Sequence, residues 1–173
     1  MIPQAQIQRD MLGLLENFTN CTCIPSNTTK SKPPYPYISF SVINTSIQKG
    51  TYARDTITEE DGAEKNVLFK PATQTWSFTA QSPDDAEAMR IAMLISDFFA
   101  EAGRLALYDR GIIIADVGAI TPRDNLLTIE YEYRKGLDVK LSLNNVIEDT
   151  ITETIENISI RNDKVGEIDV EKE

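Results

Sequence analysis

The chain has 173 residues, 41% of them apolar, with 27 acidic and 17 basic side chains and no histidine, which gives a formal charge of -10. A chain of this length can bury one hydrophobic core without help from a metal or a disulfide. The missing histidine excludes Ser-His and Cys-His catalytic pairs and the usual zinc sites, and the acidic surplus disfavours nonspecific attachment to nucleic acid or to an anionic membrane.

The first expected element is a helix over residues 2–17. Apolar residues recur there at intervals of three and four, and Pro3 suits a first helical turn. Residues 20–37 contain four prolines among several Asn, Ser and Thr residues, which favours a loop. Cys21 and Cys23 lie in this loop, and we expect both thiols to be reduced, because no histidine is present to complete a zinc site.

A strand is expected over residues 37–43, where the two faces alternate in character. The segment from Lys49 to Lys65 is predicted to be a long surface loop, because it has two glycines, five acids and few large apolar residues. The strand pattern resumes over residues 66–69 and 74–79, which places Trp76 and Phe78 on one face. This order predicts a hairpin that folds back on residues 37–43.

Residues 82–85 read Ser-Pro-Asp-Asp and predict a helix start, with Ser82 as N-cap and Pro83 at the first position. The helix is expected to run to about Ala102 and to stop at Gly103, with one apolar stripe packed on a sheet. Residues 111–117 form a continuous, mainly β-branched run. That run predicts a strand buried on both faces at the centre of the sheet.

Polar and apolar residues alternate over 127–133 and again over 137–143. A three-residue turn at 134–136 keeps Tyr133 and Leu137 on one face and pairs them, and its last residue is a glycine, as a turn with a bulge requires. Two antiparallel strands joined by this turn are therefore predicted.

The elements together predict an α+β fold, with a mixed, mainly antiparallel β-sheet packed on one face by two α-helices. Residues 1–160 are expected to form a single domain that contains the surface loop at 49–65. Residues 151–160 are predicted to be a strand, and residues 161–173 an acidic C-terminal tail.

The sequence contains neither the glycine pattern of dinucleotide-binding folds nor that of a P-loop. Two acidic groups have the chemistry to hold a divalent cation: Asp84, Asp85 and Glu87, and Glu130 with Glu132. The first group also suits the dipole of a helix start, and the second suits a solvated strand face with basic residues nearby. A metal-dependent hydrolase using surface carboxylates and a monomeric binding module remain alternatives, and no catalytic, cofactor-binding or metal-ligating residue is assigned.

Four segments share an order and spacing with a known family. They are PYPYISFSVI at 34–43, WSFTAQSPDDAEAM at 76–89, GIIIADVGAITPRDNLLTIEYEYRKGLDVKLSL at 111–143 and TITETIENISI at 150–160. In these segments the chain resembles the neck or tail terminator proteins of long-tailed bacteriophages, over about residues 2–160. The most specific parts are VGAI at 117–120 before Arg123 and Asp124, and YEYRKGLDV at 131–139.

The resemblance implies a noncatalytic virion protein without a cofactor, located in the tail or neck after assembly in the bacterial host cytoplasm. It also implies a homo-oligomeric ring, of six subunits, that caps the completed tail tube and joins it to the head connector. The implied partners are further copies of the chain, the tail tube protein and the head-completion protein. Genomic DNA would pass through the bore without specific binding, and no membrane is involved.

Two sets of contact residues follow as hypotheses. In the 49–65 loop, contact with a neighbouring subunit or the tube is assigned to Lys49, Tyr52, Arg54, Glu59 and Glu60. Acidic side chains let DNA slide past without sticking. The bore is therefore assigned to Glu130, Glu132 and Asp138, or else to the acidic tail.

Overall fold

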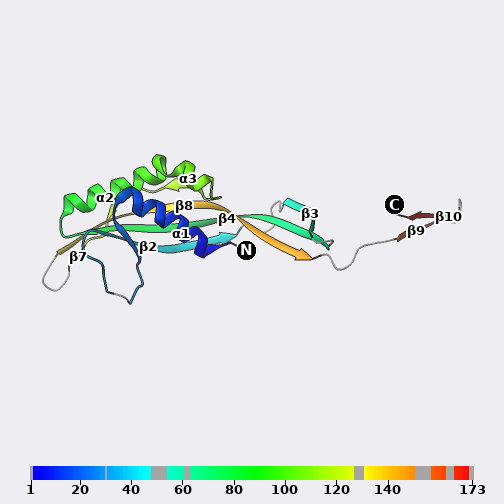
Figure 1. The fold of residues 1–173 in the computed structure, drawn as a ribbon, viewed down its shortest axis with the longest axis horizontal. Helices are drawn as coiled ribbons and strands as arrows, with labels where there is room; N and C mark the ends of the chain where they lie inside the picture. The colour runs from blue at the N-terminus through cyan, green and yellow to red at the C-terminus, as the bar shows by residue number, and fades with distance from the viewer. Residues whose placement is uncertain are drawn as a thin grey trace.

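The computed structural model describes residues 2–29, 31–47, 54–60, 63–126, 131–150, 157–162 and 166–171, and the statements below concern these residues. The helices are α1 (Gln4–Thr19), α2 (Asp85–Asp97) and α3 (Arg104–Tyr108), with a π-helical turn at Phe98–Ala102. The strands are β1 (Thr22–Pro25), β2 (Tyr37–Ile47), β3 (Arg54–Glu60), β4 (Ala63–Ser82), β5 (Ile113–Val117), β6 (Thr121–Pro122), β7 (Asn125–Leu126), β8 (Tyr131–Thr150), β9 (Asn157–Asn162) and β10 (Gly166–Glu171). The architecture is the predicted α+β fold (Figure 1).

The main sheet is built on two long central strands. Its order is β1-β2-β4-β8-β5, and β3 pairs with β4 while β6 and β7 pair with β8. Strands β4 and β8 each have 20 residues and pair antiparallel along most of their length. All other pairings in this sheet are also antiparallel except that of β1 with β2. Strands β9 and β10 form a separate two-stranded sheet.

The main sheet has one apolar face and one polar face. The register pairs Phe40 with Phe78 and Trp76 with Val139, so these side chains share the face that the helices cover. Register pairs of the opposite face include Ser39 with Thr79 and Ser77 with Asp138. Because successive residues of a strand point to opposite sides, the alternation seen in the sequence becomes this division of the sheet.

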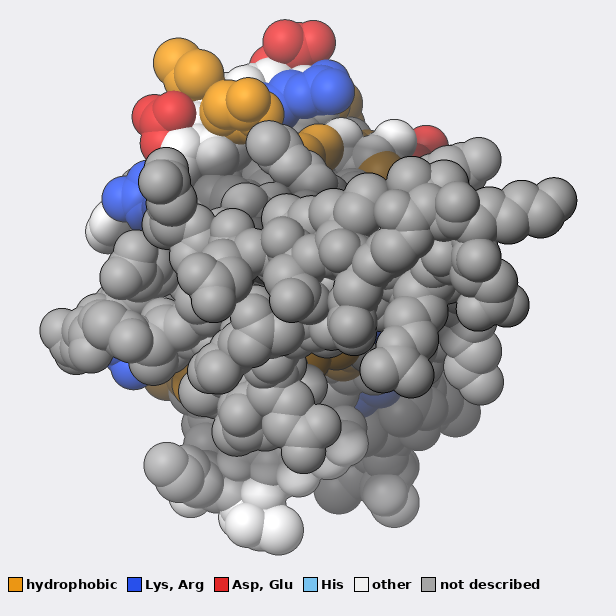
Figure 2. Space-filling view, turned by 90° about the vertical axis from the view of Figure 1, so that its right-hand side faces the viewer, with side chains coloured by type: hydrophobic (Ala, Val, Ile, Leu, Met, Phe, Trp, Pro, Cys, Tyr) orange, Lys and Arg blue, Asp and Glu red, His pale blue; other side chains and the backbone are white. Residues whose placement is uncertain are grey.

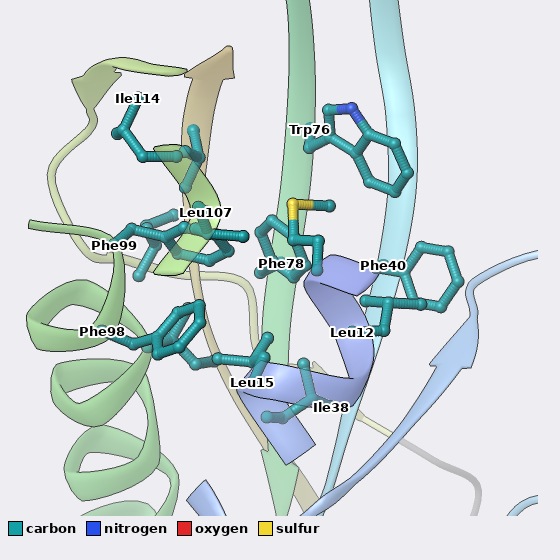
Figure 3. Packing of buried hydrophobic residues seen from close by; sticks show 14 of the residues in the cluster. Leu12, Leu15, Ile38, Phe40, Trp76, Phe78, Phe98, Phe99, Leu107 and Ile114 are labelled. Atoms are coloured by element: carbon teal, nitrogen blue, oxygen red, sulfur yellow. The ribbon is translucent and has the colours of Figure 1, made fainter. Parts of the chain in front are cut away.

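The core lies between the apolar face and the helices. Leu12 and Leu15 of α1, and Phe98 and Phe99 at the end of α2, pack toward the strands (Figure 3). The largest fully buried side chain, Trp76, lies with its ring centroid 5.9 Å from that of Phe40 and 6.3 Å from that of Phe78. Aromatic stacking on β2 and β4 therefore fills the centre of the interface between sheet and helices.

The second helix starts two residues later than predicted. Asp84, not Ser82, is the N-cap, and its Oδ2 accepts a hydrogen bond from the backbone N–H of Glu87 at 2.8 Å. The Ser82 hydroxyl instead donates to Glu87 Oε2 at 2.6 Å. The carboxylate outcompetes the hydroxyl because a charged acceptor binds an N–H more strongly.

The helical path also does not end at Gly103. It widens into a π-helical turn at residues 98–102 and continues as α3. The apolar stripe is buried as predicted, apart from Ala102, which is exposed.

The predicted turn at residues 134–136 is wrong. Strand β8 runs through it without interruption, and Gly136 pairs with Thr79 of β4 and with Thr121 of β6. A continuous strand and a three-residue turn both leave Tyr133 and Leu137 on one face, so alternation does not distinguish them. The glycine is required for another reason: a Cβ at this position would lie 2.8 Å from the Arg123 side chain.

The strand at Ile113–Val117 is at the edge of the sheet, not at its centre as predicted. It pairs only with β8 among the described strands, and the Ile113 side chain is 44% exposed. Ile112 and Ile114 are buried against the core, whereas Ile113 faces outward. A run of β-branched residues therefore does not by itself indicate burial on both faces.

Three segments predicted as irregular contain strands. Residues 22–25 form β1, which includes the first of the loop's four prolines, Pro25, and pairs parallel with β2. The 49–65 segment includes β3 and the start of β4, which form a hairpin. Within the predicted tail at 161–173, β10 pairs antiparallel with β9. In each case a pairing partner supplies hydrogen bonds that local composition does not reveal.

The other strand predictions are confirmed over the described residues, which for the strand predicted at 127–133 are residues 131–133, and two of the strands are longer than expected. The strand at 37–43 extends to Ile47, and the two runs at 66–69 and 74–79 form one strand that folds back on β2. The predicted strand at 151–160 is confirmed over residues 157–160, and its first six residues lie outside the described residues.

Two glycines of the helical layer should respond oppositely to substitution by alanine. A Cβ at Gly103 would lie 2.3 Å from the buried Phe98 ring, whereas a Cβ at Gly13 in α1 would meet no atom within 4 Å. Gly103→Ala should lower the free energy of unfolding by about 2 kcal/mol through overpacking. Gly13→Ala should raise it by about 1 kcal/mol, because alanine favours the helix. Chemical denaturation of both variants checks this, and shifts of the same sign would contradict the packing at Phe98.

Candidate functional site

The polar face of the main sheet gathers most of the partly buried polar contacts. Its side chains come from β2, β4 and β8 and from the loops before β2 and after β6. The chain reaches this face twice from outside the sheet, at residues 26–36 and at residues 123–124. Segments distant in sequence therefore meet over the strands.

Glu132 is the centre of the first cluster. Its side chain is only 1% exposed, although it lies on the face away from the helices. The Tyr35 hydroxyl donates to its Oε1 at 2.6 Å, and Arg134 donates to its Oε2 through Nε at 2.9 Å and also through Nη2. Lys32 Nζ lies 3.4 Å from Oε1, and the Tyr37 hydroxyl lies 3.3 Å from the same oxygen.

This environment keeps Glu132 ionised. Burial alone would raise its pKa, but hydrogen bonds from Tyr35 and Arg134, with the charges of Arg134 and Lys32, outweigh burial and hold the pKa below its ordinary value. The pKa of Tyr37 is raised. Burial of the phenol is the larger cause, and the neighbouring negative charge of Glu132 is the second. The cluster is therefore a carboxylate held between cations and neutral phenols.

Arg123 ties the loop after β6 to the sheet. Its Nη2 donates to Asp138 Oδ1 at 2.8 Å, and its Nη1 donates to Ser77 Oγ at 2.5 Å and Thr79 Oγ1 at 3.1 Å. Burial would raise the pKa of Asp138, but the hydrogen bonds of Arg123 and Ser77 keep it below its ordinary value. The Arg123 guanidinium passes over Gly136, where any side chain would displace it.

The loop is fixed further by Asp124. Its Oδ1 accepts the backbone N–H of Arg134 at 2.8 Å, and its carboxylate lies 3.2 Å from Lys135 Nζ. The backbone hydrogen bond is the main reason that the pKa of Asp124 is lowered. Lys135 also contacts Asp85 at the start of α2, at 2.7 Å, so this lysine joins the sheet to the helix.

Between these two clusters lies a cavity of about 270 Å³. Among the described residues, three cationic side chains line it, those of Lys32, Arg123 and Arg134, and no acidic side chain does. The uncharged part of its wall is formed by Ile24, Pro25, Ser26, Thr28, Tyr37, Ser39, Thr79 and Gln81. We call this cavity the basic pocket.

The two sets of residues assigned from the sequence fall in different parts of the chain. Lys49, Tyr52 and Glu130 lie outside the described residues, and the backbone of Arg54, Glu59 and Glu60 belongs to β3. Glu132 and Asp138 lie on the polar face, 1% and 43% exposed respectively. The expectation that Glu132 lies on a solvated face is wrong, because Tyr35, Arg134 and Lys32 cover its carboxylate.

The acidic residues at the start of α2 are used within the fold. Asp84 caps the helix, Glu87 accepts from Ser82, and Asp85 pairs with Lys135. In the described part of the chain, no group of three or more Cys, Asp or Glu residues is arranged to hold a metal ion. Figure 2 shows apolar and charged side chains side by side at the upper edge of the view, the side on which Figure 1 places α2 and α3.

Many side chains of the polar face come from the segments that carry the resemblance to terminator proteins. Comparison with family models identifies the family of the chain. The model described as phage neck terminator protein matches residues 5–168. The chain belongs to this family. Phage neck terminator proteins are structural components of the tail and neck, which gives the chain a structural role in the virion. No match to a curated protein was found.

The family assignment confirms the recognition made from sequence. It places the chain in the neck of the phage tail, among other tail and neck proteins. No helix in the described ranges is long and apolar enough to cross a membrane.

Sequence reasoning missed most of the polar face of this neck terminator protein. Arg123 and Asp124 were noted only as part of the resemblance, and Lys32 and Gln81 were not selected at all. The useful signal was Gly136 inside an alternating strand, since an interior glycine indicates that another group approaches closely. The approaching group itself, the Arg123 side chain, comes from 13 residues away and follows from no local pattern.

The three carboxylates of the polar face make stability depend on acid pH. Glu132, Asp138 and Asp124 all have pKa values below their ordinary ones, so each contributes stability that is present above about pH 4 and is lost as pH falls through its native pKa. The melting temperature should be nearly constant from pH 7 to about pH 5 and fall steeply below about pH 4. Thermal melts across this range test the prediction, and a melting temperature that rises on acidification would contradict it.

Proposed function

We propose that this neck terminator protein acts without catalysis as a ring of six subunits that caps the completed tail tube and joins it to the head connector. The observation that carries the proposal is the family match over residues 5–168. The ring would be assembled in the cytoplasm of the bacterial host. Its partners would be further copies, the tail tube protein and the head-completion protein.

The sheet offers surfaces that suit repeated subunit contacts. Within the described strands, β1 and β5 end the sheet order and each has one unpaired edge. Unpaired edges are ready to bind another chain, and closed rotational symmetry uses the same contact at every subunit. A ring is therefore a natural way for this fold to cover its edges.

The hairpin formed by β3 and the start of β4 projects beyond the part of the sheet that the helices cover (Figure 1). We assign contact with the tube or a neighbouring subunit to the residues on it and beside it: Lys49, Tyr52, Arg54, Glu59 and Glu60. Their charges, of both signs, would set the orientation of the contact more than its strength.

The net charge of -10 suits a bore through which DNA slides without binding. Asp138 and Glu130 remain our candidates for its lining. Glu132 contributes less directly, because its carboxylate is 1% exposed and is neutralised by Arg134 and Lys32.

Light scattering over a concentration series tests the ring. A mass of about 116 kDa, six times 19.4 kDa, or growth toward it with concentration, is expected. If the free chain is monomeric, isolated tail tubes should bind it at their ends. A strict monomer that also fails to bind tubes would overturn the proposal.

A second variant tests the assignment of the β3 hairpin. Replacing Glu59 and Glu60 by lysine should weaken binding to tubes or to neighbouring subunits, because it reverses the charge of the assigned contact, and a thermal melt of the variant checks that it remains folded. Glu101→Lys with Asp109→Lys is the matched control, because both residues are exposed, one in the π-helical turn and the other just after α3. If the two double variants weaken binding equally, the β3 hairpin is not the contact with the tube or the neighbouring subunit.

A further inference from the structure

The basic pocket brings together cationic side chains from three separate segments. Lys32 comes from the loop before β2, Arg123 from the loop after β6 and Arg134 from β8. Glu132 pairs with Lys32 and Arg134, and Asp138 pairs with Arg123. Three cations against two carboxylates leave this cluster with one formal positive charge in excess, although the whole chain carries -10. A negatively charged group that enters the pocket is therefore attracted by it.

The cations are held in place while some of their N–H groups remain unused. Nε and Nη2 of Arg134 donate to Glu132 Oε2, whereas its Nη1 donates to no described residue. Lys32 Nζ makes one contact within the described ranges, at 3.4 Å from Glu132 Oε1, and its side chain is 53% exposed. An ammonium has three donors and a guanidinium five. Both side chains therefore keep donors for a further acceptor, and Arg134 is already fixed in position.

The uncharged polar side chains of the wall also offer hydrogens. Ser39 is only 6% exposed, and its Oγ accepts a hydrogen bond from Gln81 Nε2 at 2.6 Å. The Ser39 hydroxyl hydrogen itself has no acceptor among the residues that the structure describes. Gln81 Oε1 accepts from the Tyr37 hydroxyl at 2.5 Å, and Thr79 Oγ1 accepts from Arg123 Nη1 at 3.1 Å. Because a buried donor without an acceptor costs free energy, this wall gains from a ligand that accepts.

The size of the cavity agrees with a small ligand. Its volume of about 270 Å³ accommodates more than one water molecule. Water would satisfy the hydroxyl donors but would not compensate the excess positive charge. Carboxylate and phosphate oxygens do both, because they carry negative charge and each accepts more than one hydrogen bond.

We infer that the basic pocket is a binding site for an oxyanion, the charged oxygens of one carboxylate or phosphate group. The Lys32 ammonium and Nη1 of Arg134 supply the charge, and the Ser39 hydroxyl supplies a buried, uncharged donor. The group has two sources, a free ion in solution or an acidic side chain of a bound protein. The site does not require the proposed ring, because a single subunit contains all of its residues.

Thermal melts of the full chain with inorganic phosphate test the site. Chloride at the same ionic strength is the reference. The melting temperature of the wild type should rise with millimolar phosphate and then saturate, by about 4 °C at ten times the dissociation constant. Phosphate also stabilises proteins in general, through exclusion from their surface, and that effect does not saturate in this range. A wild type without a saturable rise overturns the site.

Two variants that each remove one lysine charge locate the effect. Lys32→Met should raise the dissociation constant for phosphate about tenfold, because a charge-assisted hydrogen bond is lost. Lys140→Met is the matched control: Lys140 is exposed, lies on the same face of β8 by alternation with Asp138, and does not line the pocket. It should respond to phosphate like the wild type. Equal responses of the two variants overturn the assignment, and melts in chloride check that both are folded.

Light scattering with and without phosphate separates the two sources. If an acidic side chain of a bound protein fills the pocket, phosphate competes with it, and Lys32→Met weakens ring formation or binding to tube ends relative to Lys140→Met. If a free ion fills the pocket, phosphate does not weaken assembly, and both variants assemble alike. In both cases the melts show the saturable response. A wild type that forms no ring and binds no tube overturns the proposed function and leaves the oxyanion site, because the melts are measured on the free chain.

Discussion

Replacing Trp76 by alanine should lower the free energy of unfolding by about 4 kcal/mol and the melting temperature by about 12 °C. The indole is fully buried and stacks between Phe40 and Phe78. Its Nε1 also donates to Gln74 Oε1 at 3.0 Å, and Gln74 Nε2 donates to Gln4 of α1 at 2.7 Å. The substitution therefore opens a cavity and leaves a buried amide with one partner fewer.

Two further variants separate these effects in the same denaturation experiment. Trp76→Phe retains most of the packing and should lose about 1 to 2 kcal/mol, mainly through the unsatisfied Gln74 oxygen. Met93→Ala, at a position 54% exposed on α2, should change stability by less than about 1 kcal/mol. A loss for Trp76→Ala no larger than that for Met93→Ala would contradict the central place of Trp76 in the core.

Replacing Glu132 by glutamine should lower the free energy of unfolding by about 3 kcal/mol at pH 7. The amide is nearly isosteric, so the loss arises from leaving Arg134 and Lys32 without their carboxylate. The difference from wild type should shrink as pH falls through the native pKa of Glu132, because protonation then neutralises the wild-type side chain as well. Urea denaturation at several pH values measures both the loss and its pH dependence.

The control for Glu132 is Asp109→Asn, which removes one charge at an exposed position and should change stability by less than about 0.5 kcal/mol. The double variant Glu132→Gln with Arg134→Gln should lose less than the sum of the single losses, since no unpaired guanidinium remains beside the buried site. Additive losses, or a loss that does not change with pH, would show that the ion pair is not the source of the stability.

The elements best predicted from sequence are those whose signal is local. The helix of residues 4–19 and the helix after Ser82 follow from apolar spacing and from helix-start residues. The two-sided character of β4 and β8 follows from alternation. These patterns were sufficient for the α+β class and, with the order of the segments, for the family.

The errors concern long-range pairing. Alternation through Lys135 and Gly136 is the same in a turn and in a continuous strand, so only the pairing with Thr79 and Thr121 decides between them. In the same way, the β-branched run at 113–117 becomes an edge strand because nothing in the described sheet pairs with its outer side. A strand's neighbours are set by the whole topology and not by its own residues.

For the polar face too, local patterns and long-range contacts contribute different parts. The sequence by itself determined the two longer helices, the two faces of the sheet, the acidic balance and the membership of the neck terminator family, because each follows from periodicity, composition or segment order. Only the tertiary structure brought Lys32 and Tyr35 to Glu132, and Arg123 to Asp138, across 100, 97 and 15 residues respectively. Buried charges depend on partners supplied by distant segments, so the basic pocket exists only once the chain has folded.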